Sequence, residues 1–255
     1  MPARAGPLLV AGCLRPWAER VVALARPGPG ETCLDVCGDG GAVASLLRRA
    51  VGSSGRVLVV DADVAATLAE SGPARSRHAA VALPHRLPLR DGCVDVSVSL
   101  FGAVHQDDPV ATLGEMLRVT RVARGRVVAV GWAGATGAPH EAALDAALTE
   151  QLGVRSRFMA SALNVGIALE RMAANGAVAL RAQRLRDVVR FDGPEQLWAA
   201  LVDERPVAAE IATAPAAARL AARDACSARL AVYAAADGTL RIPVEAVVLR
   251  SGPGE

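Results

Sequence analysis

Two aspartates and a glycine-rich turn are the residues of this chain whose types and spacing could bind a nucleotide. Asp35 lies near the end of a predicted strand over residues 32–36, and the turn at residues 37–41 follows with three glycines. Asp61 ends the next predicted strand, 26 residues after Asp35. A glycine turn lets a ligand approach bare backbone, and an acid after the second strand can accept hydrogen bonds from both hydroxyls of a ribose. The pattern therefore predicts a nucleotide site, with a purely structural turn as the alternative.

The elements that must position these residues alternate between strand and helix over the first half of the chain. The expected strands cover residues 32–36, 56–61, 78–82, 94–100 and 125–132, and the expected helices cover residues 14–26, 42–51, 64–70 and 108–120. The strand RVLVVD at residues 56–61 is almost wholly apolar, which is typical of a strand buried on both faces of a parallel sheet. This alternation predicts a doubly wound α/β sheet, in which ligands bind beyond the carboxyl ends of the strands.

The second half of the chain has a different pattern. Beyond residue 137 we expect helices at residues 140–152, 156–174, 194–202 and 207–235, and strands at residues 178–191 and 240–249. The last strand is expected beside the strand at residues 178–191 in the same sheet.

Composition and charge exclude several classes of protein. With 52% hydrophobic and 21% charged residues among 255, the chain has ample material for a core and is not a disordered protein. All 28 basic residues are arginine and acidic residues lie among them, so no basic stripe indicates a nucleic-acid partner. No apolar run reaches the roughly 18 residues of a membrane span. We therefore expect a cytoplasmic protein without a membrane span.

The cysteines do not indicate a metal site. Their number is odd and they lack paired C-x-x-C spacing: Cys13, Cys33, Cys37, Cys93 and Cys226. Cys33 and Cys37 are four residues apart, but their place in an apolar strand and the turn after it favours thiols of the core. We expect reduced cysteines and no metal.

Several motifs resemble those of class I S-adenosylmethionine-dependent methyltransferases, in the order in which that family carries them. Residues 34–44, LDVCGDGGAVA, resemble the first motif, usually LDVGCGTGAVA, and residues 59–63, VVDAD, resemble the second. The segments RLPLRDGCVDV at residues 86–96 and FGAVHQDDP at residues 101–109 are similar to later motifs. The likeness is to the small-molecule branch related to ubiquinone and menaquinone biosynthesis methyltransferases, which also matches FDGPEQLW and DGTLRIP in the C-terminal half.

This resemblance implies a fold and a division of the chain. The fold is a seven-stranded Rossmann-like sheet with an antiparallel last strand and helical lid insertions. The four implied segments are an N-terminal helical lid at residues 1–30, the cofactor-binding core at residues 31–135, a helical substrate lid at residues 136–177, and strands and helices that complete the sheet at residues 178–255.

The resemblance also implies an activity, which is transfer of a methyl group from S-adenosylmethionine to an O, N or C nucleophile of an apolar small molecule. Such a displacement depends mainly on positioning, so no compact catalytic motif is needed. His105 is the candidate general base, with a plain loop histidine as the alternative, and Trp17, Phe158 and Met159 face the substrate unless they are ordinary core residues. The implied cofactor residues are Asp35, Cys37, Gly38, Asp39, Gly40, Gly41, Asp61, Ala62, Leu83 and Phe101. A small molecule is the expected partner, and a homodimer is compatible with this reading.

Three departures from the family pattern fall on the cofactor. In an alignment without a gap, Cys37 and Asp39 take the first two glycine positions, and the Asp39 carboxylate would repel the carboxylate of the cofactor. A one-residue deletion would instead restore two glycines. Leu83 stands where the family usually has an acid for adenine, and the only tyrosine, Tyr233, does not match the N-terminal tyrosine of many members. The alternative is therefore a methyltransferase-fold protein that no longer transfers methyl groups, either a cyclase or isomerase or a non-catalytic binding or partner subunit.

Overall fold

The computed structural model describes residues 8–37, 41–62, 79–103, 108–154, 165–203 and 211–252. Its seven-stranded sheet has the order β3-β2-β1-β4-β5-β7-β6. The strands are β1 (Thr32–Val36), β2 (Arg56–Asp61), β3 (Ala79–Val81), β4 (Val96–Leu100), β5 (Arg126–Trp132), β6 (Arg181–Phe191) and β7 (Leu240–Ser251). The first five are parallel, and β7 is antiparallel to both of its neighbours. The predicted doubly wound sheet with an antiparallel last strand is confirmed.

The described residues divide into two compact units, each built from three stretches of chain. The core unit takes its described residues from segments 14–131, 163–184 and 247–255, and the appended unit takes them from segments 1–13, 132–162 and 185–246. The core unit contains β1 to β4, so it holds the predicted nucleotide site.

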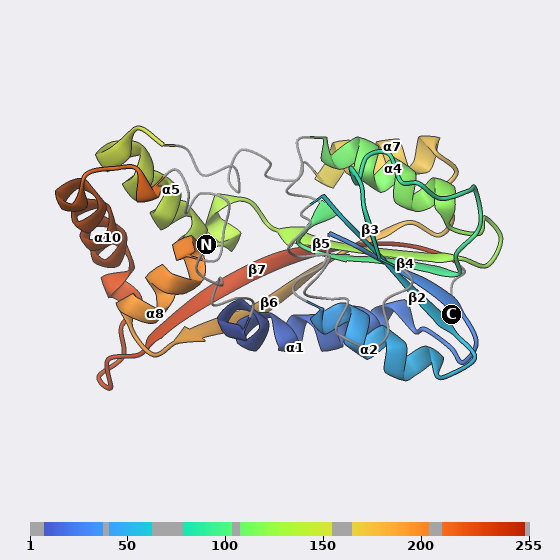
Figure 1. The fold of residues 1–255 in the computed structure, drawn as a ribbon, viewed down its shortest axis with the longest axis horizontal. Helices are drawn as coiled ribbons and strands as arrows, with labels where there is room; N and C mark the ends of the chain where they lie inside the picture. Colours follow the sequence, from blue (N-terminus) through green and yellow to red (C-terminus); the bar gives the residue numbers. More distant parts are fainter. Residues whose placement is uncertain are drawn as a thin grey trace. The chain divides into compact units, whose positions relative to one another are not determined.

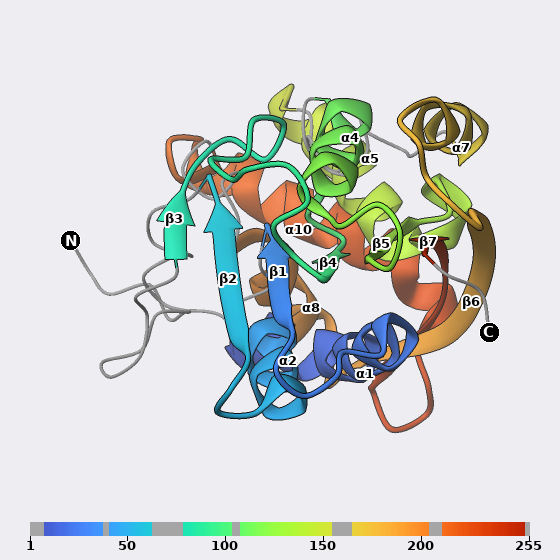
Figure 2. The same cartoon turned by 90° about the vertical axis from the view of Figure 1, so that its right-hand side faces the viewer.

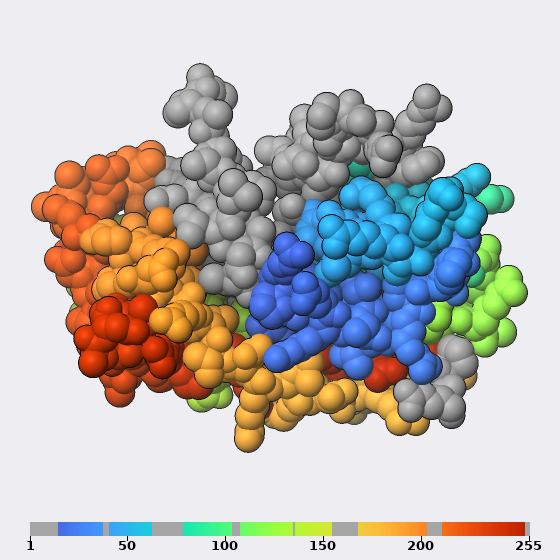
Figure 3. All heavy atoms as spheres, turned by 90° about the horizontal axis from the view of Figure 1, so that it is seen from below, coloured from blue at the N-terminus to red at the C-terminus, as the bar shows by residue number. Residues whose placement is uncertain are grey.

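Helices cover both faces of the parallel strands in the core unit. The helices α1 (Leu8–Ala25), from Leu14 onward, and α2 (Ala42–Val51) lie on one face, and Figure 3 shows them side by side there. The opposite face carries α4 (Pro109–Val119) and α7 (Val165–Ala174) (Figures 1 and 2). The sequence of α2 explains why it packs on the sheet, because its apolar residues recur at helical spacing and are buried. Its arginines lie in the last turn, near the negative end of the helix dipole.

The appended unit is mainly helical. It contains η2 (Ala135–Gly137), α5 (Pro139–Leu152), α8 (Pro194–Trp198), the π-helical turn η3 (Ala199–Asp203), α10 (Ala216–Leu230) and η4 (Ala231–Tyr233). The helices α5 and α10 pack against each other along their length (Figure 1). The side chains of His140 and Glu141 are buried in this unit, where the imidazole lies edge-on to the Trp132 ring with centroids 5.5 Å apart.

Several predicted helices differ from those observed. The helix predicted at residues 207–235 is wrong in its extent, because α10 begins only after Pro215. The ring and the missing N–H of proline disfavour it inside a helix. The helix predicted from residue 14 begins six residues earlier, at Leu8, and contains Pro16. The helix predicted at residues 156–174 is described only from Val165, and the one predicted at residues 64–70 lies outside the described residues.

Two kinds of feature are absent from the described ranges. Within them, no helix combines the length and the apolar character that crossing a membrane would require. Those same ranges contain no group of three or more His, Cys, Asp or Glu side chains placed to hold a metal ion.

Candidate functional site

The carboxyl ends of β1, β2 and β4 lie side by side because these strands are parallel neighbours (Figure 2). Asp35, the fourth residue of β1, pairs in register with Val59 of β2 on one side and Val98 of β4 on the other, and it is fully buried. Asp61 is the last residue of β2 and is partly exposed. The structure therefore brings the two predicted acids to one edge of the sheet.

The turn after β1 begins with an unusual backbone conformation. Cys37 has a φ of 55°, in the left-handed region that favours glycine, and its N–H donates to the carbonyl of Val60 over 2.8 Å. Gly41, with a φ of 91°, precedes the first turn of α2. Glycine would adopt the Cys37 conformation freely, which agrees with the alignment that places Cys37 at the first glycine of the family motif. Gly38, Asp39 and Gly40 lie outside the described residues.

The turn after β4 meets the turn after β1 at close range. Phe101 is also left-handed, with a φ of 61°, and its N–H donates to the carbonyl of Val130 over 2.9 Å. A Cβ atom added to Gly102 would lie 2.3 Å from both the Cβ and the carbonyl oxygen of Cys37, so only glycine fits there. We call this contact between residues 36–37 and residues 99–103 the β1–β4 junction.

Trp17, a predicted substrate residue, packs beneath this junction. Its ring meets the ring of Phe101 edge to face, with centroids 5.8 Å apart and planes at 67°, and only 1% of the residue is exposed. The guanidinium of Arg20 lies 5.6 Å from the centroid of the Trp17 ring. Trp17 therefore supports Phe101 from the core side. The other predicted substrate residues, Phe158 and Met159, lie outside the described residues, as does His105.

Sequence reasoning missed one residue of the junction. Ser99 is fully buried, its hydroxyl donates to the carbonyl of Val36 over 2.7 Å, and the same hydroxyl accepts from the N–H of Ala103 over 2.8 Å. The alternation VSVSL at residues 96–100 indicates a strand with a polar face, but it contains no signal for these two bonds, because both partners are backbone groups.

The residues predicted to flank adenine are apolar and open to solvent. Ala62 is exposed after β2, and Leu83 is 55% exposed after β3. Between them, the N–H of Ala82 donates to the carbonyl of Asp61 over 3.0 Å, which joins the two strand ends. Leu83 therefore offers an apolar surface at this edge but no acceptor for an amino group.

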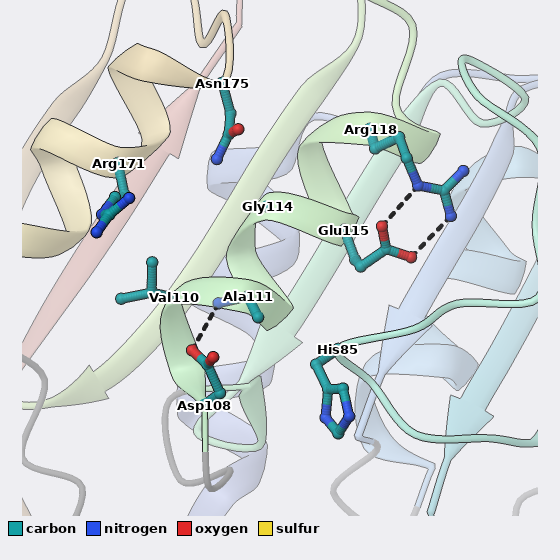
Figure 4. A pocket seen from close by; sticks show the side chains of 9 residues that line it. All are labelled: His85, Asp108, Val110, Ala111, Gly114, Glu115, Arg118, Arg171 and Asn175. Atoms are coloured by element: carbon teal, nitrogen blue, oxygen red, sulfur yellow. Dashed lines mark hydrogen bonds and ion pairs between the residues drawn. The ribbon is translucent and has the colours of Figure 1, made fainter.

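A groove lies along α4, with residues of α7 on one side and His85 on the other (Figure 4). Its volume is about 750 Å³, and it contains none of the predicted cofactor or substrate residues. The residues that line it are His85, Asp108, Val110, Ala111, Gly114, Glu115, Arg118, Arg171 and Asn175. Asp108 caps the N-terminus of α4, because its Oδ1 accepts from the N–H of Ala111 over 2.8 Å.

An ion pair at one end of this groove holds the chain that leads from β3 to β4. The guanidinium of Arg118 donates to both carboxylate oxygens of Glu115, over 2.6 and 2.7 Å, and to the carbonyls of Leu87 and Leu89 (Figure 4). Glu115 in turn accepts from the N–H of Leu87 over 2.8 Å. These hydrogen bonds, with that from Arg118 first, lower the pKa of the Glu115 carboxyl below its ordinary value.

Comparison with known families explains this arrangement. Residues 34–128, which run from β1 into β5, match the family profile described as "Methyltransferase domain". In this segment the chain is similar to class I S-adenosylmethionine-dependent methyltransferases. A ubiquinone/menaquinone biosynthesis C-methyltransferase of Xylella fastidiosa is 32% identical over 123 residues, which are 45% of this chain and 48% of that protein. A 2-phytyl-1,4-naphtoquinone methyltransferase of Trichormus variabilis is 33% identical over 116 residues, covering 42% and 49% of the two chains.

Solved structures share the fold of the methyltransferase domain and of the strands that follow it. The YcgJ protein of Bacillus subtilis superposes with a TM-score of 0.60 over 93% of this chain and 98% of its own, at 14% identity. A methyltransferase candidate from an antibiotic biosynthesis pathway of Anabaena variabilis reaches a TM-score of 0.64 over 93% and 97% of the chains, at 14% identity. The chain spans about half the length of the curated relatives that it matches.

S-adenosylmethionine is the cofactor of this family, and part of the observed edge fits it. Asp61 presents a partly exposed carboxylate at the end of β2, where it can accept from ribose hydroxyls, and Gly102 leaves room for close backbone approach between β1 and β4. The family fit is weaker on the adenine side, where Leu83 supplies apolar contact only.

Proposed function

We propose that this chain transfers the methyl group of S-adenosylmethionine to an O, N or C nucleophile of an apolar small molecule. The observation that carries the proposal is the methyltransferase domain at residues 34–128, within which Asp35 and Asp61 lie at one edge of the parallel strands. The names of the curated relatives refer to ubiquinone and menaquinone biosynthesis and to 2-phytyl-1,4-naphthoquinone, which supports an apolar acceptor.

Each predicted residue has a place in this proposal. Asp61 holds the ribose, Gly38, Gly40 and Gly41 line the methionine side, and Ala62 and Leu83 flank the adenine. Asp35, Cys37 and Asp39 complete the turn around the cofactor. When bound, the cofactor supplies an electrophilic methyl group on a sulfonium, so the protein contributes mainly orientation.

The acceptor side of the site is assigned to the turn after β4 and to the lid segments. Phe101 faces the reaction centre, and His105 takes a proton if the nucleophile must lose one. Phe158 and Met159 contribute the apolar surround of the substrate, and Trp17, which is buried, acts there by supporting Phe101. We extend the proposal to a cytoplasmic enzyme. We also propose a role in specialised small-molecule metabolism, since an all-arginine set of basic residues indicates a GC-rich coding sequence.

Calorimetric titration with S-adenosylmethionine tests the cofactor, and transfer of a tritiated methyl group to a panel of apolar phenols, amines and hydroquinones tests the reaction. We expect binding in the micromolar range and labelled product with at least one acceptor. ATP serves as a control for unspecific nucleotide binding. Equal affinity for ATP and S-adenosylmethionine, or no binding of either, would contradict the proposal. Light scattering during size-exclusion chromatography tests for the homodimer.

A further inference from the structure

The strand β4 carries two serines that are alike in burial and in direction but not in what they bond. Ser97 and Ser99 are two residues apart, so they point to the same face of the sheet, and both are fully buried. Ser99 donates to the carbonyl of Val36 in the neighbouring strand β1 and accepts from the N–H of Ala103 in the turn after β4. A single hydroxyl group therefore joins a backbone carbonyl of one strand end to a backbone amide of the other.

The two backbone groups that Ser99 joins belong to turns with unfavourable conformations. Val36 directly precedes Cys37, and Ala103 follows Phe101 and Gly102; Cys37 and Phe101 both have left-handed φ values. Such residues keep their conformation only where surrounding contacts fix it. At this junction, the contacts include the Ser99 hydrogen bonds and the close approach of Gly102 to Cys37.

We propose that Ser99 is a positioning residue, whose hydroxyl sets the place of the cofactor turn after β1 relative to the acceptor turn after β4. The proposal rests on the proposed function for its assignment of these two turns. A hydroxyl suits the position because it donates and accepts at once within a small volume, whereas alanine does neither. Without it, the carbonyl of Val36 and the N–H of Ala103 both lose a partner in the core.

Ser97 provides a matched control for the loss of a buried hydroxyl. Its oxygen lies 2.7 Å from the hydroxyl of Thr120, which donates to the carbonyl of Met116, so Ser97 must be the donor to Thr120. This bond ties β4 to the end of α4 and does not involve the β1–β4 junction. Ser97→Ala and Ser99→Ala therefore remove the same group from the same strand face, and only one of them touches the proposed site.

The experiment compares wild type, Ser97→Ala, Ser99→Ala and Ser99→Thr by titration with S-adenosylhomocysteine, by thermal unfolding and by hydrogen exchange of the Ala103 amide. We expect Ser99→Ala to weaken binding at least tenfold and to speed exchange at Ala103 at least tenfold. Ser97→Ala should lower the melting temperature to a similar extent, while affinity stays within about twofold of wild type. Ser99→Thr, which keeps the hydroxyl, should restore affinity to within about threefold.

Equal losses of affinity in Ser97→Ala and Ser99→Ala, or unchanged exchange at Ala103 in Ser99→Ala, would overturn the positioning role. If Ser99→Ala does not fold, the pair Ser99→Thr and Ser99→Val decides, because these side chains have nearly the same shape and differ in the hydroxyl. A wild-type protein that does not bind S-adenosylhomocysteine would overturn the proposed function. The exchange measurement would then still show whether Ser99 holds the two turns together.

Discussion

Cys37 and Phe101 adopt left-handed backbone conformations at the ends of two neighbouring parallel strands. Each such residue costs on the order of 1–2 kcal/mol relative to the usual conformations. In both cases the N–H of the residue continues the hydrogen bonding of the sheet, to Val60 and Val130 respectively, which offsets part of that cost. Neither residue prefers a left-handed conformation by itself. The hydrogen bonds of the sheet therefore fix the backbone conformation of both residues.

Replacing Asp61 tests the ribose contact directly. If Asp61 accepts hydrogen bonds from the ribose, Asp61→Ala should weaken binding of S-adenosylhomocysteine roughly ten- to a hundredfold, since hydrogen bonds to a charged group contribute about 1.5–3 kcal/mol. Asp61→Asn keeps one acceptor and should lose less. Calorimetry on the three proteins gives the comparison, and an affinity unchanged by Asp61→Ala would place the nucleotide elsewhere.

Asp39 and Leu83 are two positions where the chain departs from the family pattern. Restoring the family residue at either position should tighten binding of the cofactor. Asp39→Gly should tighten binding of S-adenosylmethionine at least tenfold, because it removes a charge like that of the cofactor carboxylate. Leu83→Asp should add a smaller gain by restoring an acceptor near adenine, and its 55% exposure keeps the new charge solvated. Titration of the single and double variants checks both. Weaker binding after Asp39→Gly would show that the turn functions as it stands.

At the scale of elements, the ion pair between Glu115 and Arg118 fastens the connection between β3 and β4 to α4. Because the pKa of Glu115 is lowered in the folded protein, its ionised form stabilises the fold above its ordinary pKa of about 4.3, and this contribution is lost as the pH falls through the lowered value. Glu115→Gln should therefore lower the free energy of unfolding at pH 7 by about 1–3 kcal/mol. It should also flatten the pH dependence of stability below pH 5.

Urea unfolding at several pH values measures both effects. Glu19→Gln is the control, because Glu19 pairs with Arg15 on the surface of α1 with more than half of each side chain exposed. Such a pair contributes little, so this variant should change stability by less than about 0.5 kcal/mol. A Glu115→Gln protein as stable as this control would mean that other contacts hold the connection.

The elements were far easier to predict than the contacts between them. The strand at residues 32–36 was predicted with its observed bounds, because an apolar run there ends in glycines. Alanine-rich sequence favours helix throughout residues 207–235, and that signal hid the break at Pro215. The bond from Ser99 to Val36 joins residues 63 apart, and the φ values of Cys37 and Phe101 depend on that pairing. The sequence near one residue does not indicate a contact with a residue so far along the chain. The two acids could be predicted because each lies near the end of a predicted strand, whereas the β1–β4 junction could not.

At the scale of the whole molecule, the burial of the cysteines predicts how readily their thiols react with an alkylating reagent. Burial raises the pKa of Cys33 to about 12, and it raises that of Cys226 to about 12 as well. Only about one in 10⁴ of these thiols is ionised at pH 8, and the thiolate is the reactive form. Native protein treated with iodoacetamide should therefore remain unmodified at Cys33 and Cys226, while the partly exposed Cys93 reacts before either of them. Peptide mass spectrometry with and without urea checks this, and rapid native labelling of Cys33 would contradict the packing of β1.

Each of the two compact units is built from separate stretches of the chain, which limits the fragments that can fold by themselves. The segment that matches the methyltransferase profile, residues 34–128, ends before β5 does and lacks both β7, the outer neighbour of β5, and α7, the neighbour of α4. A polypeptide expressed from that segment would keep only residues 126–128 of β5, so one edge of its sheet would lie open, a feature that promotes aggregation. We expect it to be insoluble, and a soluble, cooperatively unfolding fragment of residues 34–128 in a truncation series would refute this. The stretch that matches the family profile is therefore shorter than the stretch that we expect to fold by itself.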